Sequence, residues 1–128
     1  MSKSIIHTNA APAAVGPYSQ AVVAGTGNTV YLSGQIGLVP ATGDMISDQF
    51  EDQVKQSLTN MKAVIEAAGG TLSHIVKLTL FLTDLNKFSI ANGLMAEFLP
   101  EPFPARSTVG VASLPKGAQF EIEATLVI

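Results

Sequence analysis

Apolar and polar positions along this chain follow two periods, and the changes of period divide it into helices and strands. One apolar stripe recurs every three or four residues at Phe50, Val54, Leu58, Met61 and Ile65, and Gly69-Gly70 follows it. This spacing predicts a helix of about 20 residues whose single apolar face lies on a sheet. Asp48, with Glu51 three residues later, resembles a capping box at the start of that helix.

The segment 74–82 follows directly and is predicted to be a strand. Val76, Leu78, Leu80 and Leu82 share one face, and Ile75 and Phe81 share the other, so we expect a central strand that is covered on both sides. A second helix is predicted at about 85–99. It buries Phe88, Ala91, Met95 and Phe98, and the prolines at 100, 102 and 104 end it.

Shorter apolar runs predict five further strands, at about 4–8, 20–24, 29–33, 107–112 and 119–127. Gly25-Thr26-Gly27-Asn28 separates the second from the third, and its residues tolerate positive φ, so a hairpin is expected there. The order β-β-β-α-β-α-β-β predicts a single α+β domain over residues 1–128, a mixed sheet with two helices on one face. The other face needs cover, which we expect neighbouring subunits to provide.

Composition supports self-association and excludes several classes of protein. Charged residues make up 13% of the chain, against about 25% in ordinary domains, and the mean hydropathy is +0.35. No apolar run approaches the roughly 20 residues that span a bilayer, and no signal-peptide pattern is present. The chain has no cysteine, and its net charge of −3 provides no electrostatic footprint for nucleic acid. We therefore expect a cytoplasmic protein.

Few residues carry obvious chemistry. His7 and His74 are far apart and lack ligand spacing to another side chain, so no metal site is predicted. No nucleophile elbow is present, and Gly25-x-Gly27 lacks the third glycine of a nucleotide loop. Arg106 is either a surface or salt-bridged arginine or a bidentate clamp for a small carboxylate. Glu121 and Glu123 lie on the polar face of an amphipathic strand, where either is a solvated side chain or a general base in a half-buried cleft.

Several separated motifs resemble the Rid/YjgF family, also called the L-PSP endoribonuclease family. They are Gly16-Pro17-Tyr18-Ser19-Gln20-Ala21-Val22, Ser33-Gly34-Gln35-Ile36, Ile75-Val76-Lys77 through Phe81-Leu82-x-Asp84, Phe103-Pro104-Ala105-Arg106-Ser107, Leu114-Pro115-Lys116-Gly117-Ala118 and Glu121-Ile122-Glu123-Ala124. The match covers essentially the whole chain, in order and without large insertions.

The resemblance implies a chorismate-mutase-like fold and a homotrimer with clefts between adjacent subunits. It also implies cofactor-independent hydrolysis of 2-imino acids, derived from 2-aminoacrylate or 2-aminocrotonate, to 2-oxo acids and ammonia. By resemblance, Arg106 grips the substrate carboxylate and Glu121 positions the attacking water. The family positions that line the cleft correspond to Tyr18, Ser33 and Asn92, and the backbone around Gly34 and Thr108 adds hydrogen bonds. Glu123 keeps the structural role.

Three departures from the family pattern are expected to tune the substrate range. Thr108 stands where many members have cysteine, so thiol-dependent behaviour should be absent. Met95 stands where tyrosine is frequent, and the connection at 99–103 is short.

Two other functions stay open: a non-catalytic small-molecule-binding or chaperone-like trimer, and an endoribonuclease or translation inhibitor. The dispersed basic residues, the absence of tryptophan and the negative net charge make a nucleic-acid partner the weaker reading.

Overall fold

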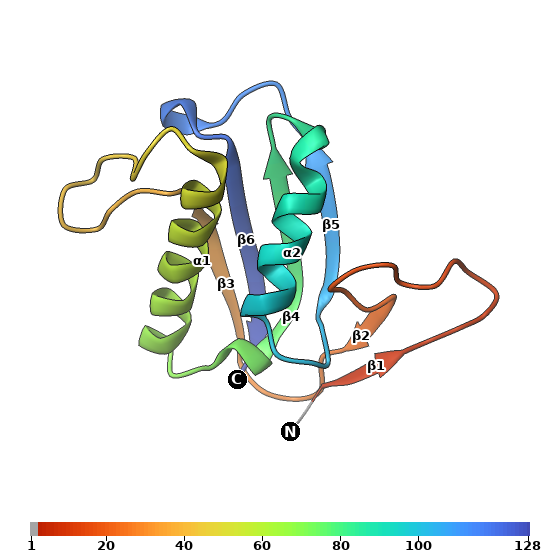
Figure 1. Cartoon of the computed structure of the whole chain (residues 1–128). Coiled ribbons are helices and arrows are strands. Elements are labelled where there is room, and N and C mark those ends of the chain that lie inside the picture. Colours follow the sequence, from red (N-terminus) through yellow and green to blue (C-terminus); the bar gives the residue numbers. More distant parts are fainter. Residues whose placement is uncertain (1–2) are drawn as a thin grey trace.

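The computed structural model describes residues 3–128, and its main layer is a four-stranded sheet with both helices on one face (Figure 1). The elements of this layer are β3 (Thr29–Gln35), β6 (Phe120–Val127), β4 (Ile75–Leu82) and β5 (Ala105–Gly110), in that spatial order, with α1 (Phe50–Ala67) and α2 (Phe88–Phe98). β4 and β5 are parallel, whereas β6 is antiparallel to both β3 and β4. The predicted α+β class, element order, mixed sheet and one-sided helices are therefore confirmed.

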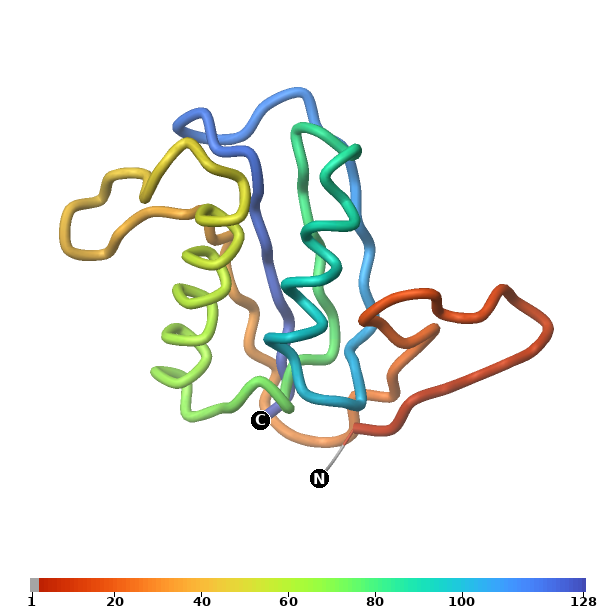
Figure 2. Tube along the Cα trace, in the orientation of Figure 1, coloured from red at the N-terminus to blue at the C-terminus, as the bar shows by residue number. Residues whose placement is uncertain are grey.

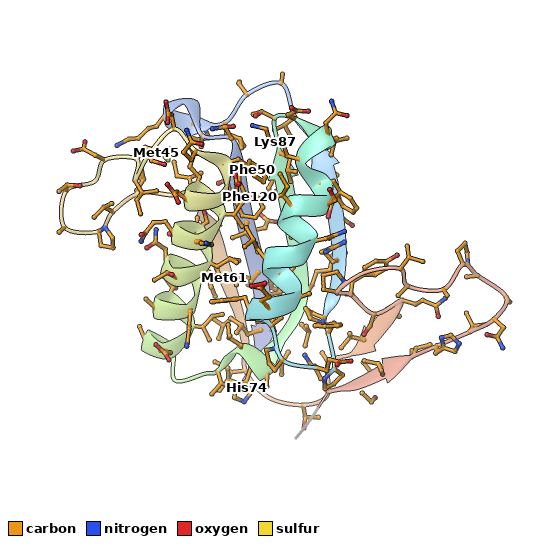
Figure 3. All side chains as sticks on the ribbon, viewed as in Figure 1. Met45, Phe50, Met61, His74, Lys87 and Phe120 are labelled. Carbon is orange, nitrogen blue, oxygen red and sulfur yellow. The ribbon has the colours of Figure 1, made fainter. Side chains whose placement is uncertain are left out.

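The apolar stripe of α1 packs on this sheet as its spacing predicts. Val54, Leu58, Met61 and Ile65 are all buried, and α1 packs them against β6 and β3 within the common core. Phe50 opens the helix and packs edge-on against Phe120, with ring centroids 6.2 Å apart (Figure 3). The core therefore lies between the two helices and the central strands. Neither helix of residues 3–128 is both long enough and apolar enough to cross a membrane.

In β4 the side chains divide between the two faces differently from the prediction. The register shifts between Ile75 and Lys77, and the irregularity turns Ile75 toward the helices together with Leu78, Leu80 and Leu82. The opposite face then carries Lys77, Thr79 and Phe81, and no helix of residues 3–128 covers it. β4 is an interior strand as expected, but only one of its faces is packed within one chain. The bulge absorbs the mismatch between the apolar run and the alternation of a strand.

Two details of the helices were also predicted wrongly. The capping box is not formed, because α1 begins at Phe50 and its N-cap, Gln49, makes no side-chain cap bond. Ser47 makes the side-chain hydrogen bonds near the start of α1 instead. Its hydroxyl accepts from the Gln49 N–H and donates to the Asp52 carboxylate. Phe88, expected in the core, is 37% exposed. A short 3-10 turn (Leu85–Lys87) precedes it, so Phe88 begins α2 beside the edge of the sheet, not above its centre.

The N-terminal arm, residues 3–24, lies outside the main sheet. Its strands β1 (Ser4–Ile6) and β2 (Ala21–Val23) pair with each other, beyond β5 at the edge of the main sheet (Figures 1 and 2). The predicted hairpin between β2 and β3 is therefore not formed. Asn28 instead exchanges two backbone hydrogen bonds with Ile128, which extends the β3–β6 ladder and leads the chain away from β3. The glycines at 25 and 27 have φ of 81° and 151°, so they open the connection where a hairpin would close it.

Candidate functional site

Arg106 lies at the centre of a cluster that joins three separate parts of the chain. Its Nη1 donates to Asn92 Oδ1 at 2.7 Å, and its Cζ lies 5.0 Å from the centre of the Tyr18 ring and 5.6 Å from that of Phe88. We call Tyr18, Phe88, Asn92 and Arg106 the guanidinium cluster. Both distances are within the range of cation–π contacts, so the two rings help to position the guanidinium.

Each element presents its member of the cluster for a local reason. Phe88 and Asn92 are four residues apart on α2, so they project from the same face in successive turns. Arg106 is the second residue of β5 and lies opposite Leu78, so its side chain points to the helix side of the sheet. Tyr18 enters from the arm, and a Cβ atom at Gly16 would sit 3.5 Å from its ring and 3.6 Å from Asn92 Nδ2. The arm therefore completes the cluster.

The charge of Arg106 is partly desolvated and has a neutral hydrogen-bond partner. Burial lowers the pKa of its guanidinium from the ordinary value, and the nearby Tyr18 side chain raises it in part. An arginine nevertheless stays protonated in a protein. No Asp or Glu of residues 3–128 forms a salt bridge with it. A positioned, partly buried cation without a carboxylate partner is suited to bind a small anion.

Glu121 belongs to a second group, built on β6 and β3. Its carboxylate lies directly against the backbone of Gly34, where a Cβ atom would overlap Oε2. Position 34 therefore needs glycine because of close approach, and not because of its φ. Ser33 precedes Gly34 and is exposed. We call Gly34 and Glu121, together with the adjacent Ser33, the glutamate group.

The two groups lie on opposite faces of the sheet. Arg106 is paired with Leu78, whose side chain is buried under the helices, whereas Glu121 is paired with Phe81 on the face without helices. Directly paired residues of neighbouring strands point to the same side. One chain therefore brings Tyr18, Asn92 and Arg106 together, and Glu121 with Gly34, but does not bring the groups to each other.

Thr108 shares the face of Arg106, two residues further along β5. Its Oγ1 is buried and has no hydrogen-bond partner within the described chain. Its backbone N–H lies on the outer edge of the sheet, because the Pro104 carbonyl accepts from Ser19 on that edge and backbone groups alternate along a strand. The backbone N–H of Thr108 is thus open to a ligand at the edge of β5, whereas its hydroxyl oxygen is buried.

Phe88 and Gly16 belong to the surroundings of Arg106 and were not among the expected site residues. The four-residue spacing of Phe88 and Asn92 was the signal that could have revealed the aromatic contact. The helix period alone assigns Phe88 to the core, because an apolar residue of a helix usually lies there.

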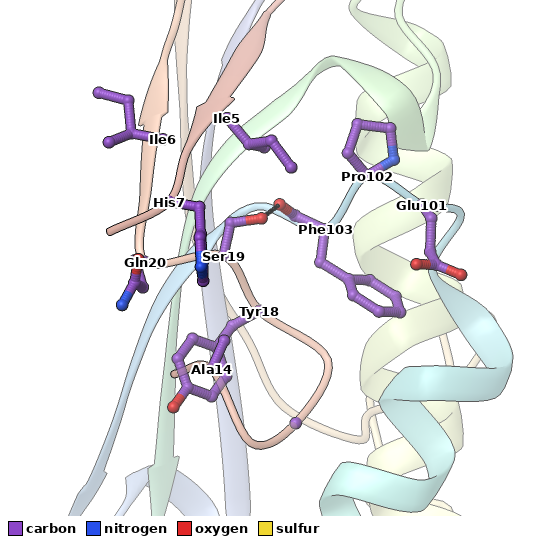
Figure 4. A pocket seen from close by; sticks show the side chains of 11 residues that line it. Ile5, Ile6, His7, Ala14, Tyr18, Ser19, Gln20, Glu101, Pro102 and Phe103 are labelled. Carbon is purple, nitrogen blue, oxygen red and sulfur yellow. Dashed lines mark hydrogen bonds between the residues drawn. The ribbon is translucent and has the colours of Figure 1, made fainter. Parts of the chain in front are cut away.

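The arm also bounds a cavity of about 540 Å³. Ile5, Ile6, Tyr18, Pro102 and Phe103 contribute most of its apolar wall, and Glu101, His7 and Gln20 contribute polar groups (Figure 4). Ser19 donates its hydroxyl hydrogen to the carbonyl of Phe103, which ties the arm to the segment before β5. Among the described residues, no three His, Asp or Glu side chains gather as a possible metal site. His7 contacts Asn9, and His74 accepts from the Thr71 N–H.

The family model described as Endoribonuclease L-PSP matches residues 8–128, nearly the whole chain. The chain belongs to this family, the Rid/YjgF family. It is 53% identical to 2-iminobutanoate/2-iminopropanoate deaminase of Dermatophagoides farinae, an alignment that covers 98% of this chain and 97% of that one.

Solved Rid structures share the fold. RidA from the Antarctic bacterium Psychrobacter sp. PAMC 21119 is 50% identical, with a TM-score of 0.77 over 98% of this chain and 99% of that one. TdcF of E. coli, solved with bound serine, is 43% identical, with a TM-score of 0.73 over 98% of both chains. The Rid protein YyfB of Yersinia pestis, of unknown function, is 26% identical but has a TM-score of 0.91 over 100% of both chains.

Proposed function

We propose that this Rid protein hydrolyses reactive 2-imino acids, derived from 2-aminoacrylate or 2-aminocrotonate, to 2-oxo acids and ammonia. The observation that carries the proposal is the guanidinium of Arg106, which is held by a neutral amide and two aromatic rings and has no carboxylate partner in the described chain. Relatives named 2-iminobutanoate/2-iminopropanoate deaminase support this substrate class. TdcF, whose structure contains serine, supports a ligand with a carboxylate.

The chemistry requires no group beyond the side chains and water. Arg106 binds the substrate carboxylate, which places the adjacent C=N carbon within reach of a water molecule. Glu121 accepts a proton from that water as its oxygen bonds to the carbon, and passes this proton to the imine nitrogen; in the next step it moves the carbinolamine hydroxyl proton to the same nitrogen. Collapse of the resulting tetrahedral carbinolamine breaks the C–N bond, releases ammonia and leaves the 2-oxo acid. We expect no cofactor and no metal.

The proposed site requires two copies of the chain. Because Arg106 and Glu121 face opposite sides of one sheet, a substrate bound at the guanidinium cluster meets the glutamate group of a neighbouring copy. A chorismate-mutase-like homotrimer satisfies this need, because each of its three clefts receives one guanidinium cluster and one glutamate group. The helix-free face of the sheet, and a chain with only 13% charged residues, support burial of that face between copies.

The remaining expected residues fit supporting roles in such a cleft. Tyr18 and Asn92 position the guanidinium, and the Thr108 N–H on the outer edge of β5 is directed toward a ligand beside Arg106. The Gly34 backbone lies against Glu121, and Ser33 is its neighbour in β3, so we expect both beside the attacking water. Thr108 replaces the thiol of other members with a hydroxyl, and we expect a change of substrate preference without loss of hydrolysis.

Ammonia release from a freshly generated imine tests the proposal. An amino acid oxidase supplies the 2-imino acid in the cuvette, and the protein should accelerate its conversion to ammonia and 2-oxo acid above the spontaneous rate. Arg106→Ala should abolish the acceleration. Binding of 2-oxobutanoate without acceleration would instead support a non-catalytic ligand-binding or chaperone-like trimer. Cleavage of a single-stranded RNA that persists in Arg106→Ala would support the endoribonuclease reading, which nothing in the charge distribution favours.

A further inference from the structure

β2 and β3 each have one edge that no other strand of the described chain pairs with. β3 pairs with β6 on one side, and no strand of residues 3–128 pairs with its other side. β2 pairs with β1 and likewise leaves one side unpaired. A row of unpaired backbone N–H and C=O groups is a template for another strand. The free edge of β2 is therefore suited to pair with the free edge of β3.

Side chains at both edges show the same lack of cover. Tyr31 on β3 is 79% exposed, and Ile5, Ile6 and Val23 on the arm are each about half exposed. Large apolar side chains gathered at unpaired strands indicate a surface that another chain covers. No electrostatic repulsion opposes pairing of these strands, because β1, β2 and β3 contain no charged residue.

The sequence between β2 and β3 is suited to bring these two edges together. Gly25-Thr26-Gly27-Asn28 is typical of a hairpin turn, yet the structure shows it open. The arm is held elsewhere by its own chain: the Ser19 N–H donates to the Pro104 carbonyl, the Ser19 hydroxyl donates to the Phe103 carbonyl, and Ser19 pairs with Ala105. An arm fixed beside β5 in this way leaves its own β3 uncovered.

We propose that the arm is exchanged between copies: β2 of one copy pairs antiparallel with the free edge of β3 in a second copy. The arm then bridges β5 of its own chain and β3 of the next, and the same contacts repeated around a ring leave neither β2 nor β3 with an unpaired edge. Tyr18 travels with the arm, so each guanidinium cluster takes Tyr18 and Arg106 from one chain. The alternative is the hairpin, in which β2 covers β3 of its own chain and a neighbour's arm lies beside β5.

The comparison with solved Rid structures is consistent with two positions of the N-terminal arm in this family, one exchanged and one folded back as a hairpin. The structural likeness does not follow the sequence likeness: YyfB superposes better than the RidA that shares nearly twice as many residues. Exchange and hairpin place the same strands in the same surroundings, and they differ only in the course of the chain at 24–28. Such a pair of states has nearly equal contacts, which is the usual condition for exchange between identical chains.

The absence of cysteine permits a direct test in the full-length protein. Two double-cysteine variants are compared, Ser19→Cys/Ala105→Cys at the observed arm–β5 contact and Val22→Cys/Tyr31→Cys at the β2–β3 contact of a hairpin register. Neighbouring strands are about 4.8 Å apart, within the Cα separation that a disulfide spans. Each pair is oxidised in the native protein, and the products are separated under denaturing, non-reducing conditions. The four single-cysteine variants serve as controls.

Exchange predicts opposite results for the two pairs. The Ser19/Ala105 pair should link within one chain and run at 13.3 kDa, whereas the Val22/Tyr31 pair should link chains into covalent oligomers. The reverse pattern would establish the hairpin and overturn the proposal. Failure of the Val22/Tyr31 pair to link at all, in a folded protein of unchanged native mass, would also overturn it. Since no activity is measured, the result is independent of the proposed deaminase reaction.

Discussion

Arg106→Lys is the substitution that separates a carboxylate clamp from a mere positive charge. Lysine keeps the charge but replaces a planar fork of five N–H donors with a single ammonium on a flexible stem. In the structure one guanidinium nitrogen already donates to Asn92 at 2.7 Å, and the guanidinium contacts the rings of Tyr18 and Phe88. The remaining donors of arginine are free for both oxygens of a carboxylate. An ammonium cannot satisfy Asn92 and both oxygens in one plane.

The size of the effect follows from the bonds that are lost. A hydrogen bond to a charged group contributes about 1.5–3 kcal/mol. Each 1.4 kcal/mol corresponds to a factor of ten, so loss of one such bond to the substrate lowers kcat/KM by about tenfold to a hundredfold. The loss should be found mainly in KM and in the affinity for 2-oxobutanoate, because the carboxylate is bound in both the ground state and the transition state.

Initial rates of ammonia release, together with calorimetric titration of 2-oxobutanoate, measure the two quantities. Circular dichroism and native mass must first show that the variant keeps the fold and the oligomeric state. Lys62→Arg, on the exposed face of α1, is the matched control, since it changes the same two residue types away from both groups. Near-wild-type hydrolysis by a folded Arg106→Lys protein would refute the clamp and leave Arg106 a structural residue.

Four further outcomes are expected. Glu121→Gln keeps the size of the side chain but removes the base, so kcat should fall by about 10²–10⁴-fold while 2-oxobutanoate binding is retained; loss of binding instead would contradict the assigned role. Gly34→Ala places a methyl group where the Glu121 carboxylate lies, so kcat should fall at least tenfold in a folded protein, and an unchanged rate would show that the close approach is unimportant. Asn92→Asp supplies Arg106 with an anionic partner at hydrogen-bond distance, so KM should rise with little effect on thermal stability; a fall in KM would rule out the free-cation model. Light scattering at micromolar concentration should give three times 13.3 kDa, and a monomer mass would exclude the shared cleft.

Local periodicity in the sequence determined much of this fold. The stripe from Phe50 to Ile65 predicted α1 and its buried face, because a helix repeats its environment every three to four residues wherever it packs. The alternation of β6 likewise separated Phe120 and Ile122 from Glu121. The motifs around Tyr18, Arg106 and Glu121 indicated the family, and the match over residues 8–128 confirms it.

Only the tertiary structure decided how distant segments meet. The pairing of Arg106 with Leu78 and of Glu121 with Phe81 places the two groups on opposite faces, and this depends on strand register, which no single segment contains. The position of the arm was equally undetermined, because Gly25–Asn28 permits a hairpin as readily as the open course that Asn28 takes toward Ile128. The helix period predicted Phe88 in the core, whereas the structure places it against the guanidinium of Arg106 on β5. Each difference has the same physical reason: local sequence sets the period of an element, whereas the partner of an edge or a charge is chosen among distant alternatives of similar free energy.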